Sequence, residues 1–176
     1  MAIAGGPGSG KSTLARAVAS QLGAPVVELD ALWWRPEWTP AEVKDFRDKV
    51  AQTAESSTWV IEGNYLAEVG CDIVWRRADT LVWLDLPRRL AVGRALRRTF
   101  VRVARREQLW ATNRQPLSAL SPSSVGRLVR RWPEYSRRIA AALDVDVYPH
   151  LKVVRLRSDR EVADWLAAIQ PVNDSM

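Results

Sequence analysis

Short apolar runs alternate along the chain with stretches of helical periodicity. Five runs are predicted to be strands, and the third and fourth are mostly apolar, as strands buried on both faces are: residues 1–4, 26–29, 58–62, 80–86 and 151–156. Strands that alternate with helices favour a parallel sheet with helices on both faces. The pattern therefore predicts an α/β fold, and the length of 176 residues predicts one domain over residues 1–176.

Helical periodicity follows three of these runs. After the first run, Leu14 and Val18 lie on one face of a helix. After the second run, residues 39–42 have the N-cap threonine, the N1 proline and the early acid of a helix start, so a helix is predicted over residues 40–55. A last helix is predicted after the fifth run, through Ile169.

An arginine-rich segment separates the fourth and fifth runs. It is predicted to begin with a helix from Arg88 to about Arg106. The apolar stripe of this helix consists of Val92, Leu96, Phe100 and Val103, and the arginines at helical spacing on another face are Arg94, Arg98, Arg102 and Arg105. Residues 112–124, with two prolines and four serines, are predicted to be a loop before a second arginine-bearing helix. This arrangement suggests a lid over about residues 98–130.

The net charge of +6 is concentrated in this segment. Between Arg88 and Arg138, fourteen arginines are opposed only by Glu107 and Glu134, a local balance of +12. The positive charge is carried by guanidinium groups, whose forked donors suit phosphate oxygens. This indicates nucleic acid or nucleotide phosphates as partners, unless the arginines only form a solvated surface.

Composition excludes several classes of protein. The single cysteine, Cys71, cannot form an internal disulfide, so nothing in the sequence requires an oxidising compartment. No apolar run has the length of a membrane span, and the N-terminus does not have the layout of a signal peptide. We therefore expect a cytoplasmic protein that has no membrane contact and acts as a monomer. No cluster of cysteines and histidines suggests a zinc site.

The stretch from Gly5 to Thr13 fits the pattern G-x-x-x-x-G-K-[ST]. Glycines let successive backbone N–H groups point at phosphate oxygens, and the positive end of the next helix adds to the site. In this pattern the lysine reaches the β- and γ-phosphates and the following hydroxyl binds Mg²⁺. The sequence therefore predicts a site for ATP and Mg²⁺. The residues predicted to hold the triphosphate are Gly5, Gly8, Ser9, Gly10, Lys11, Ser12 and Thr13, with Ser12 also a metal ligand.

Two acidic residues follow predicted strands. Asp30 ends the second run, and carboxylates at the carboxyl ends of parallel strands face the ligand crevice. Asp30 is therefore a candidate to bind a substrate hydroxyl or to orient it for attack, and a helix cap is the alternative. Glu62 ends the third run, where a second acid is expected to hold the waters around Mg²⁺.

Three tryptophans occur within six residues, between the second predicted strand and the helix after it. They either roof the core or form the wall of a substrate pocket. In the second case, Trp34 lines the pocket and Arg35 contacts an anionic group of the substrate.

These residues resemble the adenylate-kinase-like P-loop kinases and, within them, the topology modulation proteins. The most specific matches are Trp33-Trp34-Arg35-Pro36 and Glu62-Gly63-Asn64-Tyr65. The resemblance covers nearly the whole chain up to about Arg138, and its other matches are the phosphate loop, Arg77-Ala78-Asp79-Thr80, Trp83-Leu84-Asp85-Leu86-Pro87-Arg88 and Arg97-Arg98-Thr99. It implies a three-layer P-loop NTPase fold with a five-stranded parallel sheet in the order 2-3-1-4-5 and a helical lid.

The resemblance also implies roles for individual residues. Arg94 would lie near the adenine and Arg98 on the phosphates, because both stand at the family's distance from Pro87. The second arginine of the lid would be Arg130, Arg131 or Arg137, of which Arg131 is taken as the candidate. Asn64 and Tyr65 would contact the substrate. The family usually has aspartate at the position of Glu62, and residues 157–160 resemble the loop that borders the adenine.

The leading hypothesis is an ATP-dependent kinase that transfers the γ-phosphoryl group to a small nucleotide-like or hydroxylated acceptor. This chemistry needs positioning and charge neutralisation, which Lys11, Mg²⁺ and arginines such as Arg98 supply. The alternative is an ATP-binding protein that acts on DNA through its basic segment. The spacing of the arginines from Pro87 favours the kinase, and the chain has no signature of a nucleic-acid-binding module.

Overall fold

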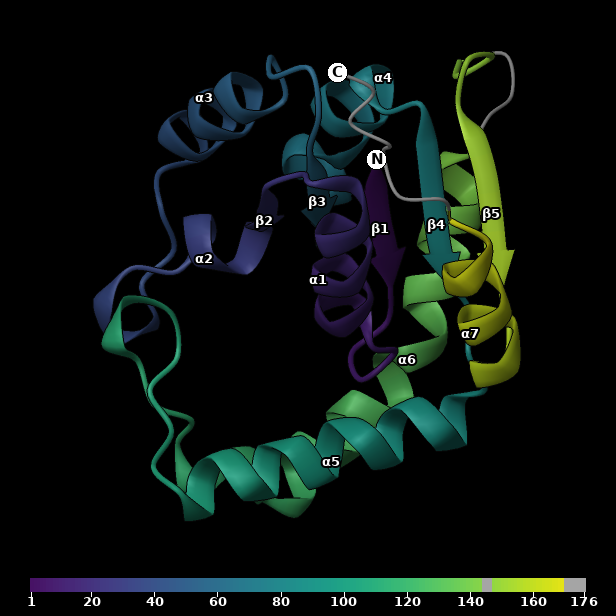
Figure 1. Cartoon of the computed structure of the whole chain (residues 1–176). Helices are drawn as coiled ribbons and strands as arrows, with labels where there is room; N and C mark the ends of the chain where they lie inside the picture. Colours follow the sequence, from purple (N-terminus) through teal and green to yellow (C-terminus); the bar gives the residue numbers. More distant parts are fainter. Residues whose placement is uncertain (144–146, 170–176) are drawn as a thin grey trace.

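The computed structural model describes residues 1–143 and 147–169, and its centre is a five-stranded parallel sheet (Figure 1). The strands are β1 (Ala2–Gly5), β2 (Val26–Glu28), β3 (Val60–Glu62), β4 (Thr80–Leu84) and β5 (Lys152–Leu156). Their order is β2-β3-β1-β4-β5, and every pairing is parallel. The predicted fold class and strand order are therefore confirmed.

Helices connect and cover these strands. They are α1 (Lys11–Leu22), α2 (Leu29–Trp33), α3 (Val43–Thr53), a π-helix (Leu66–Val74), α4 (Trp75–Arg77), α5 (Arg88–Ala104), α6 (Pro122–Ala142) and α7 (Asp159–Ala168). Among the described residues, no helix combines the length and the apolar character needed to cross a membrane.

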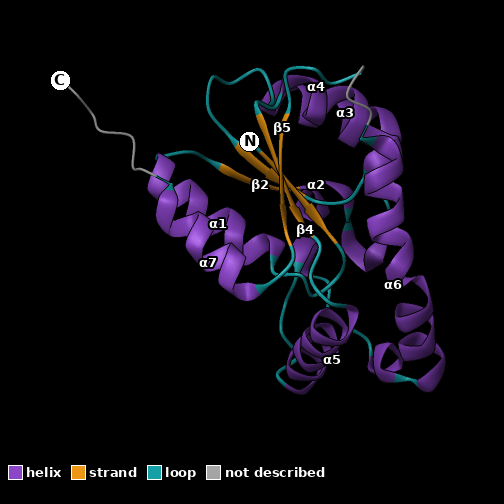
Figure 2. Cartoon of the chain, turned by 90° about the vertical axis from the view of Figure 1, so that its right-hand side faces the viewer, coloured by secondary structure: helices purple, strands orange, loops and turns teal. Residues whose placement is uncertain are grey.

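Side chains of the strands contribute to two hydrophobic cores, and the helices that cover them lie on the two faces of the sheet (Figure 2). On one face, Ile3 and Val82 pack with Val18 of α1, and residues of α7 complete this core. On the other face, Ile61 and Leu81 pack with side chains from α3, the π-helix and α6. Alternate burial on two faces explains why the third and fourth predicted strands are mostly apolar.

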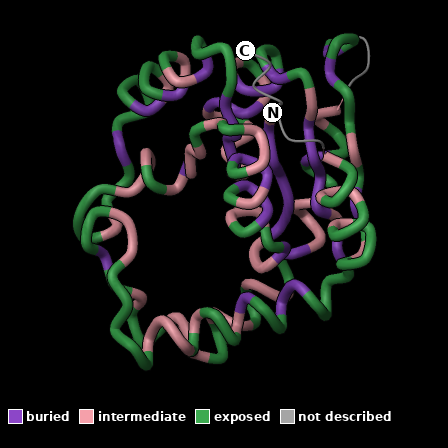
Figure 3. The backbone as a smooth tube through the Cα atoms, in the orientation of Figure 1, coloured by how far each residue is buried: buried purple, intermediate pink, exposed green. Residues whose placement is uncertain are grey.

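Helix α5 lies across the carboxyl ends of the strands (Figure 1). Its buried residues lie in its first half, where Ala91 and Val92 pack against Trp132 of α6. Phe100, which the sequence places on the same apolar stripe, is 62% exposed, so that part of the prediction is wrong. The reason is that the second half of α5 extends past the body of the sheet, where much of its surface is exposed (Figure 3).

Residues 105–121 connect α5 to α6 and lie at the left of Figure 1, on the side of the molecule opposite α7. They contain two short 3₁₀ turns, Trp110–Thr112 and Leu117–Leu120. On that side they meet the loop between α2 and α3. We call residues 105–121 the connecting segment. The second predicted arginine-bearing helix is confirmed as α6.

Helix α3 begins at Val43, three residues after the predicted start at Pro40. Pro40 instead forms an isolated antiparallel bridge with Trp34, and the Ala41 N–H donates to the carbonyl of Trp33 at 2.7 Å. The two ends of the loop between α2 and α3 are thus paired with each other before α3 starts. The N-cap signal at Thr39 is overridden by this tertiary pairing.

Candidate active site

The phosphate loop joins β1 to α1 and is held between α5 and α6. Gly8 has a φ of 77°, and a Cβ built on it would lie 2.0 Å from the carbonyl oxygen of Ala91 in α5. From the other side, the Trp132 indole N–H donates to the carbonyl of Pro7 at 3.2 Å. The loop therefore needs glycine at position 8 for both its conformation and its packing. The two helices fix its shape in advance of any ligand.

Ser9 and Gly10 complete the loop. Gly10 is the N-cap of α1 with a φ of 93°, which directs the first N–H groups of the helix into the loop. The Ser9 hydroxyl is buried and has no hydrogen-bond partner in the described part of the chain. A buried donor of this kind, beside a helix N-terminus, suits a bound phosphate.

Lys11, Ser12 and Glu62 meet at the start of α1. The Ser12 hydroxyl donates to Glu62 Oε1 at 2.7 Å, and the Lys11 ammonium lies 3.5 Å from the carbonyl of Gly6. Glu62 is 3% exposed, and this burial raises the pKa of its carboxyl, whereas Lys11 and the bond from Ser12 oppose the rise. Burial likewise lowers the pKa of Lys11, which Glu62 and Asp30 oppose.

The same group fits Mg²⁺. A hydroxyl and a carboxylate are the hard oxygen donors that this ion prefers, and it usually keeps several waters and binds substrate phosphates as well. The described residues contain no group of three or more metal-ligating side chains, so the protein alone does not form a complete cage. Ser12 would bind the ion directly, and Glu62 would orient its waters.

We predict that Glu62→Gln lowers kcat and weakens the dependence of turnover on Mg²⁺, because the amide keeps the bond from Ser12 but removes the negative charge. Glu62→Asp should be tolerated. A Mg²⁺ titration of ATP turnover for the wild type and both variants measures this. If Glu62→Gln matches the wild type at every Mg²⁺ concentration, Glu62 has no role at the metal.

Asp30 and Tyr65 form the opposite side of the site. Asp30 lies in the first turn of α2, and Tyr65 lies in the loop after β3. The Tyr65 hydroxyl donates to Asp30 Oδ1 at 2.5 Å. Burial and the charge of Asp30 raise the pKa of Tyr65 well above its ordinary value, so the tyrosine stays a proton donor. Glu28, not Asp30, is the N-cap residue of α2, so the helix-cap alternative for Asp30 does not apply.

Asn64 joins the two sides of the site. Its side-chain oxygen accepts from the Gly5 N–H at 3.1 Å, and its amide donates to the Gly5 carbonyl. These bonds fix the end of β3 to the start of the phosphate loop. Asn64 therefore has a positioning role in addition to the substrate contact that the sequence predicts.

One cavity of about 550 Å³ unites these groups, and we call it the main cavity. Eight of the residues predicted to form the site line it: Lys11, Ser12, Thr13, Asp30, Glu62, Asn64, Tyr65 and Arg98. The phosphate loop and the groups predicted for the acceptor thus face each other within one enclosure.

Outside the phosphate loop, four residues predicted to form the site do not line the main cavity. Trp34 packs edge-on against Trp38, with ring centroids 5.5 Å apart. Arg35 binds Asp45 at 2.8 Å on the exposed surface, directed away from the cavity. Arg94 binds Asp159, and Arg131 is exposed on α6. The first two lie in the tight loop before α3, whose internal bridge sets their direction.

Trp38 also lines the main cavity, in agreement with the pocket-wall alternative for the three tryptophans. Further lining residues were not identified from the sequence: Arg16, Glu28, Arg102, Trp110, Gln115 and Tyr135. Arg102 stands four residues after Arg98, so helical spacing alone places both on one face of α5. The tryptophans come from two loops far apart in sequence, and no local pattern indicates that they meet.

These loops are joined by side-chain hydrogen bonds that we call the clasp, formed by Arg35 and Trp38 with Asn113 and Arg114. Asn113 is 5% exposed; it accepts from the Trp38 N–H at 3.0 Å and donates to the Arg35 carbonyl at 2.8 Å. The Trp38 indole donates to the Arg114 carbonyl at 3.1 Å. The two loops meet away from the phosphate loop (Figure 1), and Trp38, Trp110 and Gln115 from them line the main cavity.

Strained backbone is confined to the same two loops and to the start of the connecting segment. In the described part of the chain, the non-glycine residues with a positive φ are Glu37, Trp38, Arg106, Ala111 and Thr112. A left-handed conformation is uncommon for residues other than glycine, asparagine and aspartate. The contacts of the clasp hold these residues in place.

A smaller cavity of about 330 Å³ lies on the outer side of the phosphate loop, between α1, α5 and α7. Leu14, Leu84, Val162 and Leu166 give it apolar walls, and Thr13, Arg94 and Asp159 also line it. The Arg94 guanidinium donates two hydrogen bonds to Asp159, at 2.9 and 2.7 Å.

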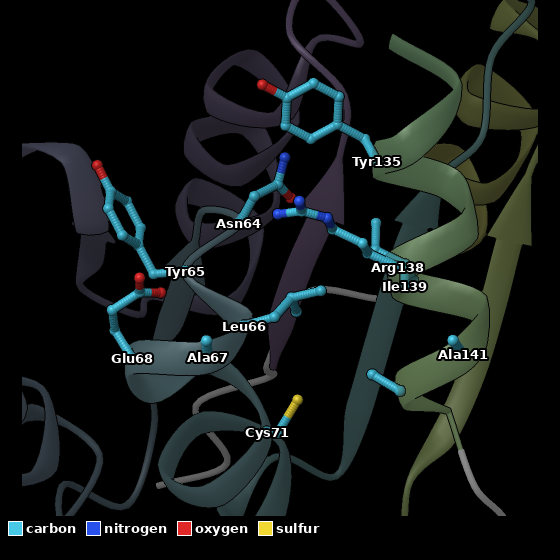
Figure 4. A pocket seen from close by; sticks show the side chains of 11 residues that line it. Asn64, Tyr65, Leu66, Ala67, Glu68, Cys71, Tyr135, Arg138, Ile139 and Ala141 are labelled. Atoms are coloured by element: carbon cyan, nitrogen blue, oxygen red, sulfur yellow. The ribbon is translucent and has the colours of Figure 1, made fainter. Parts of the chain in front are cut away.

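A third cavity of about 620 Å³ lies between the π-helix and α6 (Figure 4). It shares Asn64, Tyr65 and Tyr135 with the main cavity. Its deeper walls are apolar and include Cys71, whose thiol pKa is raised by burial. Figure 4 shows the guanidinium of Arg138 extending toward Asn64 at its upper edge.

Comparisons with known proteins agree with this architecture. Residues 1–62 match the family model "ATPase family associated with various cellular activities (AAA)". This part of the chain holds the phosphate loop and ends at Glu62, so the match concerns the nucleotide-binding elements. No curated protein sequence matches the chain at a significant level.

Solved structures share the whole fold. A protein from Chloroflexus aurantiacus, described as a candidate kinase, aligns with a TM-score of 0.55 and 14% identity over 94% of this chain and 93% of that chain. The shikimate kinase from Bacteroides thetaiotaomicron aligns with a TM-score of 0.57 and 17% identity, again over 94% and 93%. The chain therefore has a P-loop NTPase fold that it shares with solved kinases.

Proposed function

We propose that this protein is an ATP-dependent kinase that transfers the γ-phosphoryl group to a hydroxyl of a small acceptor. The observation that carries the proposal is that one cavity holds the phosphate loop on one side and the Asp30–Tyr65 pair on the other. Phosphoryl transfer needs little else from a protein than positioned reactants and neutralised charge. The resemblance to topology modulation proteins and the fold shared with solved kinases support the same class.

In the proposed reaction, the acceptor oxygen forms a bond to the γ-phosphorus while the bond from that phosphorus to the bridging oxygen of ADP breaks. Asp30 accepts the proton of the acceptor hydroxyl, and Tyr65 holds the carboxylate in place. Lys11 and Arg98 neutralise the charge on the transferred group. Mg²⁺, when bound through Ser12 and Glu62, supplies charge neutralisation between the phosphates.

The nucleoside of ATP would occupy the smaller cavity beside the phosphate loop. Thr13 lines both this cavity and the main one, so a nucleotide can extend from one to the other past the start of α1. Arg94 and the loop 157–160 would border the base, as the resemblance implies. The connecting segment would act as the lid, because its residues Trp110 and Gln115 line the main cavity while that segment meets the α2–α3 loop.

We predict that Asp30→Asn lowers kcat by ~10²- to 10⁴-fold, the usual contribution of a general base, while ATP affinity changes little. The amide still accepts from Tyr65 but is a poor proton acceptor. Steady-state turnover and equilibrium binding of ATP measure the two quantities separately.

Tyr65→Phe is the matched control for Asp30→Asn. It removes the hydrogen bond that Asp30→Asn keeps and leaves the carboxylate in place, so its effect on kcat should be smaller. If Asp30→Asn weakens ATP binding as much as it lowers turnover, Asp30 has a structural role instead.

A further inference from the structure

Within the proposed phosphotransfer, we infer that the acceptor is a polyol without an anionic group: a neutral or amine-bearing sugar or cyclitol. The inference rests on the proposed function, because it concerns the part of the main cavity where α2 meets the connecting segment. That part is lined by Glu28, Trp38, Trp110 and Gln115, next to Asp30. The groups that line it determine which acceptors it can stabilise.

The basic side chains of the main cavity are Lys11, Arg16, Arg98 and Arg102. Lys11 and Arg98 are assigned to the phosphates of ATP in the proposed reaction. Arg16 is bound to Glu28 at 2.6 Å, and Arg102 lies 3.7 Å from Glu107 and over the ring of Trp110. Both remaining cations of the cavity are therefore already paired with a carboxylate.

Two other arginines are near but point elsewhere. Arg35 is bound to Asp45 on the exposed surface. Arg138 lines the neighbouring cavity, where it lies 3.8 Å from Glu134 and is 73% exposed. Neither guanidinium lines the main cavity, so neither offers a phosphate or carboxylate of the acceptor a direct partner there.

Carboxylates and aromatic rings, instead of unpaired cations, line this part of the main cavity. Glu28 Oε2 accepts from the Trp110 indole at 3.1 Å, and Asp30 accepts from Tyr65. Ionised carboxylates only accept hydrogen bonds, so they match hydroxyl and ammonium donors. The rings of Trp38 and Trp110, 6.4 Å apart and edge-on, offer apolar surface to a sugar ring or a face to a cation.

An anionic acceptor would meet an unfavourable field in this place. Its phosphate or carboxylate would lose water and face Glu28 and Asp30, while the remaining cations, Arg16 and Arg102, are already paired with carboxylates. The cavity thus favours a substrate that donates hydrogen bonds to these carboxylates. Neutral and amine-bearing polyols meet this condition, whereas the anionic groups of nucleoside monophosphates and sugar acids do not.

The test compares ATP turnover with matched acceptors that differ in charge. Suitable sets are glucose, glucosamine and gluconate; myo-inositol and inositol phosphate; and adenosine and AMP. We expect a neutral or amine-bearing member to accelerate ADP release, with a kcat/KM at least ~10-fold above that of its anionic counterpart, a difference of about 1.4 kcal/mol. A faster anionic member overturns the inference and leaves the proposed kinase intact.

The outcomes also separate the inference from the proposed function. If ATP hydrolysis that depends on Lys11 is measured but no neutral or amine-bearing polyol accelerates it, the acceptor class is wrong and the phosphotransfer site stands. If no turnover of ATP depends on Lys11, with water or with any acceptor, the proposed function itself fails.

Glu28→Gln tests the residue that would determine specificity. We expect it to raise the KM of the best amine-bearing or neutral acceptor by ~10-fold, with kcat and the KM of ATP nearly unchanged. Arg16→Gln is the matched control, because it breaks the same ion pair but keeps the carboxylate. An equal rise of the acceptor KM in both variants would show that the ion pair, and not the carboxylate, matters.

Discussion

Arg98→Ala is expected to lower kcat by ~10³-fold or more, the range found for arginines that stabilise a transferred phosphoryl group, while ATP affinity changes much less. Arg98 lines the main cavity and, among the described residues, has no carboxylate within 4 Å, so its guanidinium is available to the phosphates. A contact made mainly in the transition state affects turnover and not ground-state binding. Steady-state turnover and equilibrium binding of ATP, measured for the wild type and the variant, separate the effect on kcat from the effect on ATP affinity.

Arg97→Ala is the matched control, since it removes the same charge from the next position of α5, where the side chain is exposed and does not line the main cavity. The pair also decides between a kinase and a DNA-binding surface. On DNA, either substitution would reduce the slope of log K against log salt by about one, without affecting catalysis. Retained turnover in Arg98→Ala, with a reduced salt slope, would favour the DNA-binding alternative.

Lys11→Ala is expected to abolish phosphoryl transfer, with a loss of ~10³-fold or more in kcat/KM for ATP. No other lysine or arginine lies in the phosphate loop, and Lys11 lines the main cavity together with Glu62. Lys49→Ala, on the exposed face of α3, is the control for loss of a lysine. Unchanged turnover in Lys11→Ala, with the fold intact by circular dichroism, would falsify the kinase proposal.

The fold could be predicted because its determinants are local. Strands buried on both faces, such as Thr80–Leu84, are mostly apolar, and Leu14 and Val18 repeat with the period of α1. Element ends were less accurate where a tertiary contact decides them. Val43 starts α3 because Pro40 is engaged with Trp34, and Phe100 is exposed because α5 extends past the sheet.

The nucleotide half of the candidate site was predicted for the same reason. The phosphate loop is a continuous motif, and Asp30 and Glu62 follow strands whose ends meet at one edge of the sheet. The far end of the cavity was not predicted. Glu28 and Trp110 are 82 residues apart, and neither helical nor strand periodicity relates the end of β2 to a distant loop that meets it through a side-chain hydrogen bond.

The positive φ angles of Glu37, Trp38, Ala111 and Thr112 bear on how reactants enter and leave. A left-handed conformation costs about 1–2 kcal/mol per residue. A hydrogen bond of the clasp contributes about 1 kcal/mol net, so cost and gain are of the same order. We therefore expect the two loops to be held together by little net free energy, so that they can separate to exchange ATP, acceptor and products.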